Sequence, residues 1–166
     1  MGGYEPPQAS HNMRIASVGK ISDKMFYIVF TDRIQIYEMI SENLISLKKT
    51  YSDIPHFIPI SCKYDEETKT FYISTYIELL VIQIGDLEDH PLIKSLDTNG
   101  TCTFVDKFQK TLHMACSYEK IHYIAEILVD GIDSMILNRY YSDLEVPRTT
   151  KIRKVGEDAM VLIGDD

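Results

Sequence analysis

Short hydrophobic runs recur along the chain in the same order, roughly every 45 residues. Each unit has one apolar run, a short polar turn, and a second run in which β-branched and polar residues alternate. The pairs of runs are Phe26–Phe30 with Ile34–Glu38, Phe71–Thr75 with Val81–Asp86, and Leu112–Cys116 with Ile121–Glu126. A period-2 alternation bounded by turn residues predicts β-strands joined as hairpins.

Two further strands flank each hairpin. The leading strands are predicted at Arg14–Val18, Ile58–Lys63, Cys102–Asp106 and Lys151–Val155. The closing strands are predicted at Leu44–Thr50, Pro91–Leu96 and Ile136–Tyr141, and Ala159–Ile163 begins a fourth unit. Four strands every 40-odd residues form an antiparallel meander, which is typical of a β-propeller blade. The predicted fold is therefore all-β, with three blade-like units and the start of a fourth.

The segment Asp32–Met39 resembles the turn and strand that end a blade in the WD-repeat propellers, with Tyr37-Glu38 in place of the family's Trp-Asp. The resemblance covers most of residues 14–166. The family's Gly-His dipeptide is absent and the chain has no tryptophan. The resemblance implies a partial β-propeller, in which a longer chain or a partner completes the ring, because propellers protect their sheet edges by closing.

A helical interpretation of two segments gives an alternative fold. Apolar residues at 36, 40, 44 and 47 follow helical spacing, and those at 121, 124, 125 and 128 lie on one helical face. If both segments were helices, the fold would be α+β, a small sheet with two or three helices. The β-branched density of Ile34 and Ile36 favours strands.

The overall composition is that of one folded domain. The chain has 166 residues, of which 45% are hydrophobic and 25% charged. We expect a disordered leader at 1–12 and a single β-rich domain at 13–166. The net charge of −8 argues against nucleic acid as a partner. The longest uncharged apolar stretch, Leu79–Gly85, is far shorter than the roughly 20 residues of a membrane span.

Candidate chemistry is sparse. Three cysteines spaced 40 and 14 apart match neither a disulfide framework nor paired zinc ligands, which predicts reduced thiols and an intracellular location, cytoplasmic or nuclear. His113 and Cys116 would point to opposite faces of a strand, as a surface histidine and a buried cysteine. We expect no metal, no cofactor and no enzymatic activity. The alternative is a small α+β enzyme or ligand-binding domain with a site built from His113, His122, Cys116 or acidic clusters.

Aromatic residues suggest a protein-binding role. Those at strand positions, Phe26, Phe30, Phe71 and Phe104, are expected in the core between sheets. In a meander, the turn after the second strand and the loop to the next unit emerge at the same end. Six residues are predicted to form a protein-binding surface there: Arg33, His56, Phe57, Tyr76, Tyr118 and Glu119. Such residue types dominate interface hot spots, which favours a non-catalytic interaction or scaffold module, part of a larger propeller assembly.

Overall fold

A computed structural model describes residues 14–55, 57–87, 90–98, 100–118, 121–132, 134–141, 149–154 and 160–164. All regular structure in these ranges is β-strand, so the all-β prediction is confirmed. The helical alternative for residues 34–48 and 118–129 is wrong. In the first segment, Ile34 and Ile36 alternate with the less buried Gln35 and Tyr37, a period of two that a strand satisfies.

Twelve strands form three antiparallel sheets of four, each in simple sequence order. Sheet 1 contains β1 (Ile15–Lys20), β2 (Met25–Phe30), β3 (Ile34–Ser41) and β4 (Leu44–Tyr51). Sheet 2 contains β5 (Ser61–Asp65), β6 (Thr70–Ser74), β7 (Glu78–Gln83) and β8 (Leu92–Asp97). Sheet 3 contains β9 (Thr101–Phe108), β10 (Thr111–Tyr118), β11 (Ile121–Val129) and β12 (Met135–Tyr141). β13 (Thr149–Lys154) and β14 (Met160–Gly164) form a two-stranded sheet.

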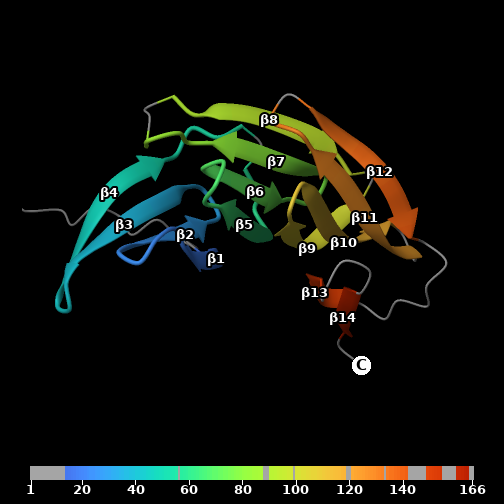
Figure 1. Ribbon diagram of the computed structural model, residues 1–166, viewed down its shortest axis with the longest axis horizontal. Helices are drawn as coiled ribbons and strands as arrows, with labels where there is room; N and C mark the ends of the chain where they lie inside the picture. Colours follow the sequence, from blue (N-terminus) through green and yellow to red (C-terminus); the bar gives the residue numbers. More distant parts are fainter. Residues whose placement is uncertain are drawn as a thin grey trace, which may run out of the picture.

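The sheets stand side by side along an arc (Figure 1). Their first strands, β1, β5 and β9, lie on the concave side, and their last strands, β4, β8 and β12, lie on the convex side. β1 contacts β5, β5 contacts β9, and β13 contacts β9 and β10. This arrangement of consecutive meanders is compatible with a β-propeller-like fold.

Two hydrophobic clusters fill the spaces between the sheets. The cluster between sheets 1 and 2 includes Val29 and Ile36 from sheet 1 and Phe71 and Ile73 from sheet 2. The cluster between sheets 2 and 3 includes Tyr72 of β6, together with side chains of β9, β10 and β11. Neighbouring residues of β6 therefore face different sheets, and all five residues of this strand are buried. Sheet 2 is consequently packed on both faces.

Aromatic rings and a glycine fix the contact between sheets 1 and 2. The Tyr27 ring meets Phe71 edge-on, with ring centroids 5.0 Å apart, and lies 6.1 Å from Tyr64. Tyr27 crosses over its cross-strand partner Gly19, where a Cβ atom would collide with the ring. Glycine is therefore required at this position, because any side chain would displace the ring from the core.

One cysteine prediction is wrong. Cys102 of β9 and Cys116 of β10 are cross-strand partners and form a disulfide, while Cys62 is free. The spacing of 14 residues did not predict this pair, because the two cysteines become neighbours only through the register of the β9–β10 hairpin. The disulfide removes the argument from which an intracellular location was predicted, since structural disulfides are typical of oxidising compartments.

Candidate protein-binding surfaces

The β6–β7 turn, the loop that precedes β5, the start of β9 and the end of β10 lie at one end of the molecule. The Thr101 hydroxyl donates a hydrogen bond to the Tyr76 carbonyl (3.1 Å), which joins the β6–β7 turn to the start of β9. Thr101 pairs with Ser117, next to Tyr118. The Ile60 amide donates to the Ser74 carbonyl (2.8 Å), which holds the loop between sheets 1 and 2 at the same end.

The six predicted binding residues have different environments. Tyr76 and Tyr118 are exposed, at 55% and 57% of their surface. The Arg33 guanidinium is bonded to the carboxylate of Asp32 (2.7 Å) and is partly covered. Phe57 is only 9% exposed because the loop that crosses from β4 to β5 inserts it into the core, so its expected place on the surface is wrong. His56 and Glu119 lie outside the described residues.

Three exposed isoleucines, which the sequence did not predict as binding residues, lie at the same end of the molecule as Tyr76 and Tyr118. Ile58 and Ile77 lie in loops and are 56% and 64% exposed, and Ile121 is 55% exposed opposite Tyr118. The available signal was an isoleucine within a turn, between Tyr76 and Glu78, where polar residues are usual. We call Ile58, Tyr76, Ile77, Tyr118 and Ile121 the loop-end surface.

A second apolar surface is the face of sheet 1 that points away from sheet 2, here called the outer face. Phe26 and Tyr37 are cross-strand partners on this face, and their rings stack with centroids 5.3 Å apart. Phe26 and Phe30 are only partly buried, so the prediction that they lie in a core between sheets is wrong; Phe71 meets that prediction. The side chain of Phe104 lies outside the described part.

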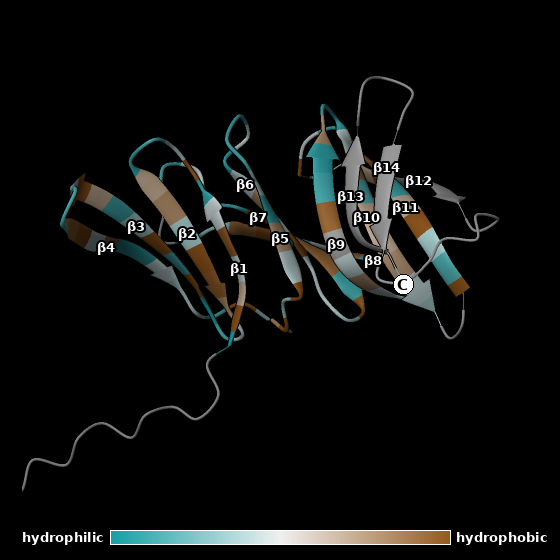
Figure 2. Ribbon diagram, turned by 90° about the horizontal axis from the view of Figure 1, so that it is seen from below, coloured by the Kyte–Doolittle hydropathy of each residue, from teal (hydrophilic) through white to brown (hydrophobic). Residues whose placement is uncertain are grey.

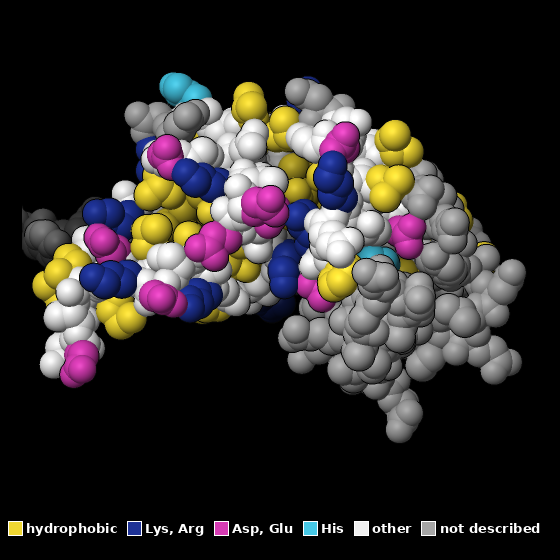
Figure 3. Space-filling model, viewed as in Figure 1, with side chains coloured by type: hydrophobic (Ala, Val, Ile, Leu, Met, Phe, Trp, Pro, Cys, Tyr) yellow, Lys and Arg dark blue, Asp and Glu magenta, His cyan; other side chains and the backbone are white. Residues whose placement is uncertain are grey.

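The β3–β4 hairpin extends the outer face beyond the neighbouring sheet (Figure 1). β3 and β4 have eight residues each, whereas β7 and β8 have six. Hydrophobic residues of this hairpin that are 42–58% exposed are Met39, Ile40, Leu44, Ile45 and Leu47. Figure 2 shows hydrophobic residues at the hairpin tip, and Figure 3 shows yellow side chains at this end of the molecule, on the left.

His113 and Cys116, two of the residues considered for catalysis or metal binding, lie on opposite faces of sheet 3. His113 pairs with Glu126 on one face of sheet 3, and Cys116 pairs with Tyr123 on the other. His113 is only 2% exposed, so the expected surface histidine is wrong, and its Nε2 lies 3.5 Å from the Glu126 carboxylate. Cys116 is in the disulfide and is therefore not available as a thiolate. Within the described ranges, no three His, Cys, Asp or Glu residues are placed to hold a metal ion.

The free thiol of Cys62 is also unsuited to chemistry. Burial raises its pKa, so the reactive thiolate is suppressed. Burial likewise raises the pKa of the neighbouring Tyr27 phenol. Both groups belong to the contact between sheets 1 and 2, where they have a packing role.

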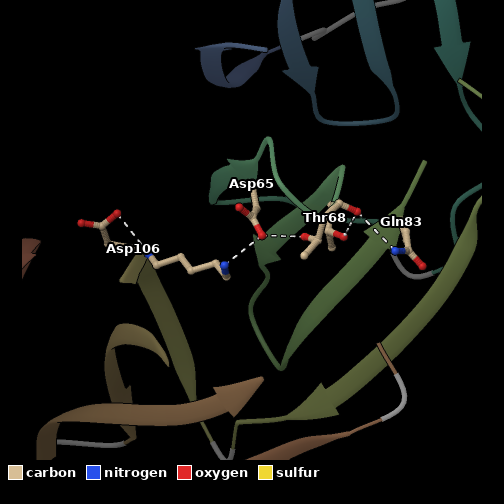
Figure 4. Close-up of polar contacts among 6 residues, drawn as sticks. Asp65, Thr68, Gln83 and Asp106 are labelled. Atoms are coloured by element: carbon tan, nitrogen blue, oxygen red, sulfur yellow. Dashed lines mark hydrogen bonds and ion pairs between the residues drawn. The ribbon is translucent and has the colours of Figure 1, made fainter. Parts of the chain in front are cut away.

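A cleft of about 430 Å³ lies between sheets 2 and 3, and both lysines on its wall form ion pairs. Lys107 on its wall reaches the Asp65 carboxylate (2.8 Å), which also accepts a hydrogen bond from the Thr68 hydroxyl (2.5 Å) (Figure 4). Burial alone would raise the pKa of Asp65, but the bonds from Lys107 and Thr68 outweigh it and hold this pKa below its ordinary value. Lys110 on the same wall pairs with Asp130 (2.6 Å).

No protein-family model matches the sequence, and no curated protein matches it. The described part of the chain contains no helix that could span a membrane. The function must therefore be argued from the loop-end surface and the outer face.

Proposed function

We propose that this chain is a non-catalytic protein-binding module that forms part of a larger, WD-repeat-like propeller assembly and binds its partner through the loop-end surface. The observation that carries the proposal is the repeated exposure of large apolar side chains at one end of consecutive sheets. Tyr76 and Ile77 come from the β6–β7 turn, and Tyr118 comes from the corresponding end of β10.

Folding leaves the apolar surface of these side chains unburied, so it is available for burial against a partner. Each of these side chains is more than half exposed, so its apolar surface remains in water. Single exposed apolar residues are ordinary, but several at one end, with tyrosines among them, mark interaction sites. The backbone beneath them is fixed by hydrogen bonds, including Thr75 N–H to the Glu78 carbonyl (2.9 Å) in the Tyr76 turn. A partner would therefore meet a preformed surface, with little ordering cost.

The proposal is tested with a double variant, Tyr76→Ala and Tyr118→Ala. Both side chains are exposed, so the variant should fold with an unchanged circular dichroism spectrum. The matched control is Leu92→Ala, which removes a 58%-exposed side chain at the start of β8, at the opposite end of sheet 2. The tagged proteins are incubated with an extract of the source cells, and the retained proteins are identified by mass spectrometry.

We expect at least one protein that the wild type and the Leu92→Ala variant retain equally and the double variant loses by tenfold or more. That protein, once purified, should show the same difference in a direct binding titration. The same set of retained proteins, at equal yield for all three chains, would contradict a binding role for the loop-end surface.

A further inference from the structure

Sheet 1 is built for packing on both faces, although the described chain covers only one. In each sheet, alternate residues of the second strand face the preceding sheet. In sheets 2 and 3 these positions are buried against sheets 1 and 2 respectively. The corresponding positions, by sequence repeat and strand, are Phe26 and Ile28 in β2, Phe71 and Ile73 in β6, and Leu112 and Met114 in β10. In sheet 1 these positions lie on the outer face.

The outer face has the polarity of an interface interior. Cross-strand pairing places four residues in one row across it, Lys20, Phe26, Tyr37 and Leu47. Other large apolar members of the face are 42–59% exposed, namely Ile15, Val18, Met39 and Ile45. The Tyr37 hydroxyl donates a hydrogen bond to the Gln35 side chain (2.7 Å), so these two polar groups of the outer face are hydrogen-bonded to each other.

Charge does not oppose the pairing of two such faces. The paired positions that make up the face carry no Asp or Glu, so the acidic groups behind the chain's net charge of −8 lie elsewhere. Lys20 lies on β1, at the edge of the row. Two faces brought together would therefore bury apolar surface without placing carboxylates opposite one another.

The far face of sheet 3 is covered in part. β13 contacts β9 and β10, and Ala115 and Ile124 on that side are only 3% and 1% exposed. Leu128 and Ile136 on the same face, over β11 and β12, are 40% and 60% exposed. Within the described ranges, the outer face is thus the four-stranded face that has no sheet against it. A second molecule offers an equal and similarly apolar face in its own sheet 1.

We propose that a second copy of this chain covers the outer face, with the two copies of sheet 1 packed face to face about a two-fold axis. The proposal rests on the proposed role in a larger assembly but uses a surface distinct from the loop-end surface. Four strands about 4.8 Å apart, two of six residues and two of eight, give a flat footprint of about 450 Å². This flat area is somewhat more than half of the roughly 800 Å² per partner of a standard interface, and the relief of the side chains adds to it.

The β3–β4 hairpin would extend this interface. Its equivalents in sheets 2 and 3 expose polar turn residues such as Asp86 and Asp130. In sheet 1 the hairpin instead carries Met39, Ile45 and Leu47 on the outer face, where two pairs, Met39–Ile45 and Tyr37–Leu47, lie across from one another. In the face-to-face dimer these side chains would contact the sheet of the second copy.

The experiment measures molar mass by light scattering after size exclusion, over a hundredfold range of protein concentration. The monomer mass is 19.1 kDa. The test variant is Val18→Lys with Leu47→Lys, at two exposed outer-face positions. The control variant is Leu92→Lys with Ile136→Lys, at two positions of similar exposure on β8 and β12, which makes the same change in net charge.

We expect the wild type and the control variant to be dimers with similar dissociation constants. The dissociation constant of the test variant should be at least a hundredfold higher. Leu47 lies on the projecting hairpin, away from both hydrophobic clusters. The single variant Leu47→Lys should therefore raise the dissociation constant at least tenfold and leave the circular dichroism spectrum unchanged. A wild type that is monomeric at every concentration would overturn the inference, as would a dimer that resists the test variant or that the control disrupts equally. The Tyr76→Ala, Tyr118→Ala variant should remain dimeric, so failure of the loop-end surface is distinguishable from failure of the dimer.

Discussion

Replacement of Lys107 by methionine should loosen the contact between sheets 2 and 3. The Lys107 ammonium lies 2.8 Å from the Asp65 carboxylate, and both side chains are only 13% exposed. Methionine keeps most of the aliphatic length of lysine and removes the charge. The change therefore leaves the Asp65 carboxylate poorly solvated, with Thr68 still donating a hydrogen bond.

The expected loss of unfolding free energy is about 2 kcal/mol. Removing one partner of a fully buried ion pair costs about 3–5 kcal/mol, because the other charge is left uncompensated. The residual exposure of this pair and the hydrogen bond from Thr68 reduce that penalty. The matched control is Lys110→Met, which breaks the pair with Asp130, where both side chains are about three-quarters exposed. We expect no measurable loss for the control, because exposed pairs contribute little.

The assay is urea unfolding of the wild type, the two single variants Lys107→Met and Asp65→Asn, and the double variant. The double variant should lose less than the sum of the single losses by at least about 1 kcal/mol, since the uncompensated charge is gone. Strictly additive losses, or a Lys107→Met loss no larger than that of Lys110→Met, would refute the reasoning. Either result would mean that the ion pair between Lys107 and Asp65 does not stabilise the contact between sheets 2 and 3.

The same pair has a defined pH dependence. The folded-state pKa of Asp65 lies below its ordinary value of 3.8. A group with a lowered folded pKa contributes stability above its unfolded pKa and loses it as the pH falls through the folded value. Wild-type stability should therefore fall between about pH 4 and pH 2 more steeply than that of Asp65→Asn, which lacks the titrating group.

Three further outcomes follow from the packing. Gly19→Ala should lower the unfolding free energy by about 1–3 kcal/mol in urea unfolding, because a methyl group there collides with the Tyr27 ring. Non-reducing peptide mass spectrometry should recover Cys102 linked to Cys116, and replacing both by serine should cost about 3 kcal/mol for a loop of this length. Burial raises the folded-state pKa of the Tyr27 phenol. The stability that the neutral phenol contributes is therefore present below about pH 10 and is lost as the pH rises above that value. In urea unfolding, the Tyr27→Phe variant should lose less stability at alkaline pH than the wild type.

The strands were predictable because local patterning and burial agree. Runs such as Phe71–Thr75 lie almost wholly within β6 (Thr70–Ser74), and the predicted closing strand Leu44–Thr50 differs from β4 by one residue. The period of two decides between strand and helix where hydrophobic spacing alone is ambiguous, as at Ile34 and Ile36. Boundaries shifted where a loop is apolar, since the predicted strand at Ile58–Lys63 begins only at Ser61.

Features that depend on the placement of sheets were not predictable from the sequence. Phe57 and Ile58 are adjacent apolar residues in one loop, yet the first is in the core and the second is exposed. Phe26 and Phe71 occupy equivalent positions, and they differ because only the second has a sheet against it. The disulfide likewise depends on the register of β9 against β10. Each of these outcomes is set by tertiary contacts that no local pattern encodes.

The central claim is that the sheets pack face to face, with sheet 2 enclosed and the outer face of sheet 1 open to a partner. Hydrogen exchange of the wild type, followed by mass spectrometry at a concentration low enough to hold the chain as a monomer, tests it directly. Peptides from β6 and β7 should exchange most slowly, at the rate of global unfolding, and the β3–β4 hairpin tip should exchange early. Exchange in β6 and β7 as fast as in the hairpin tip would contradict the account.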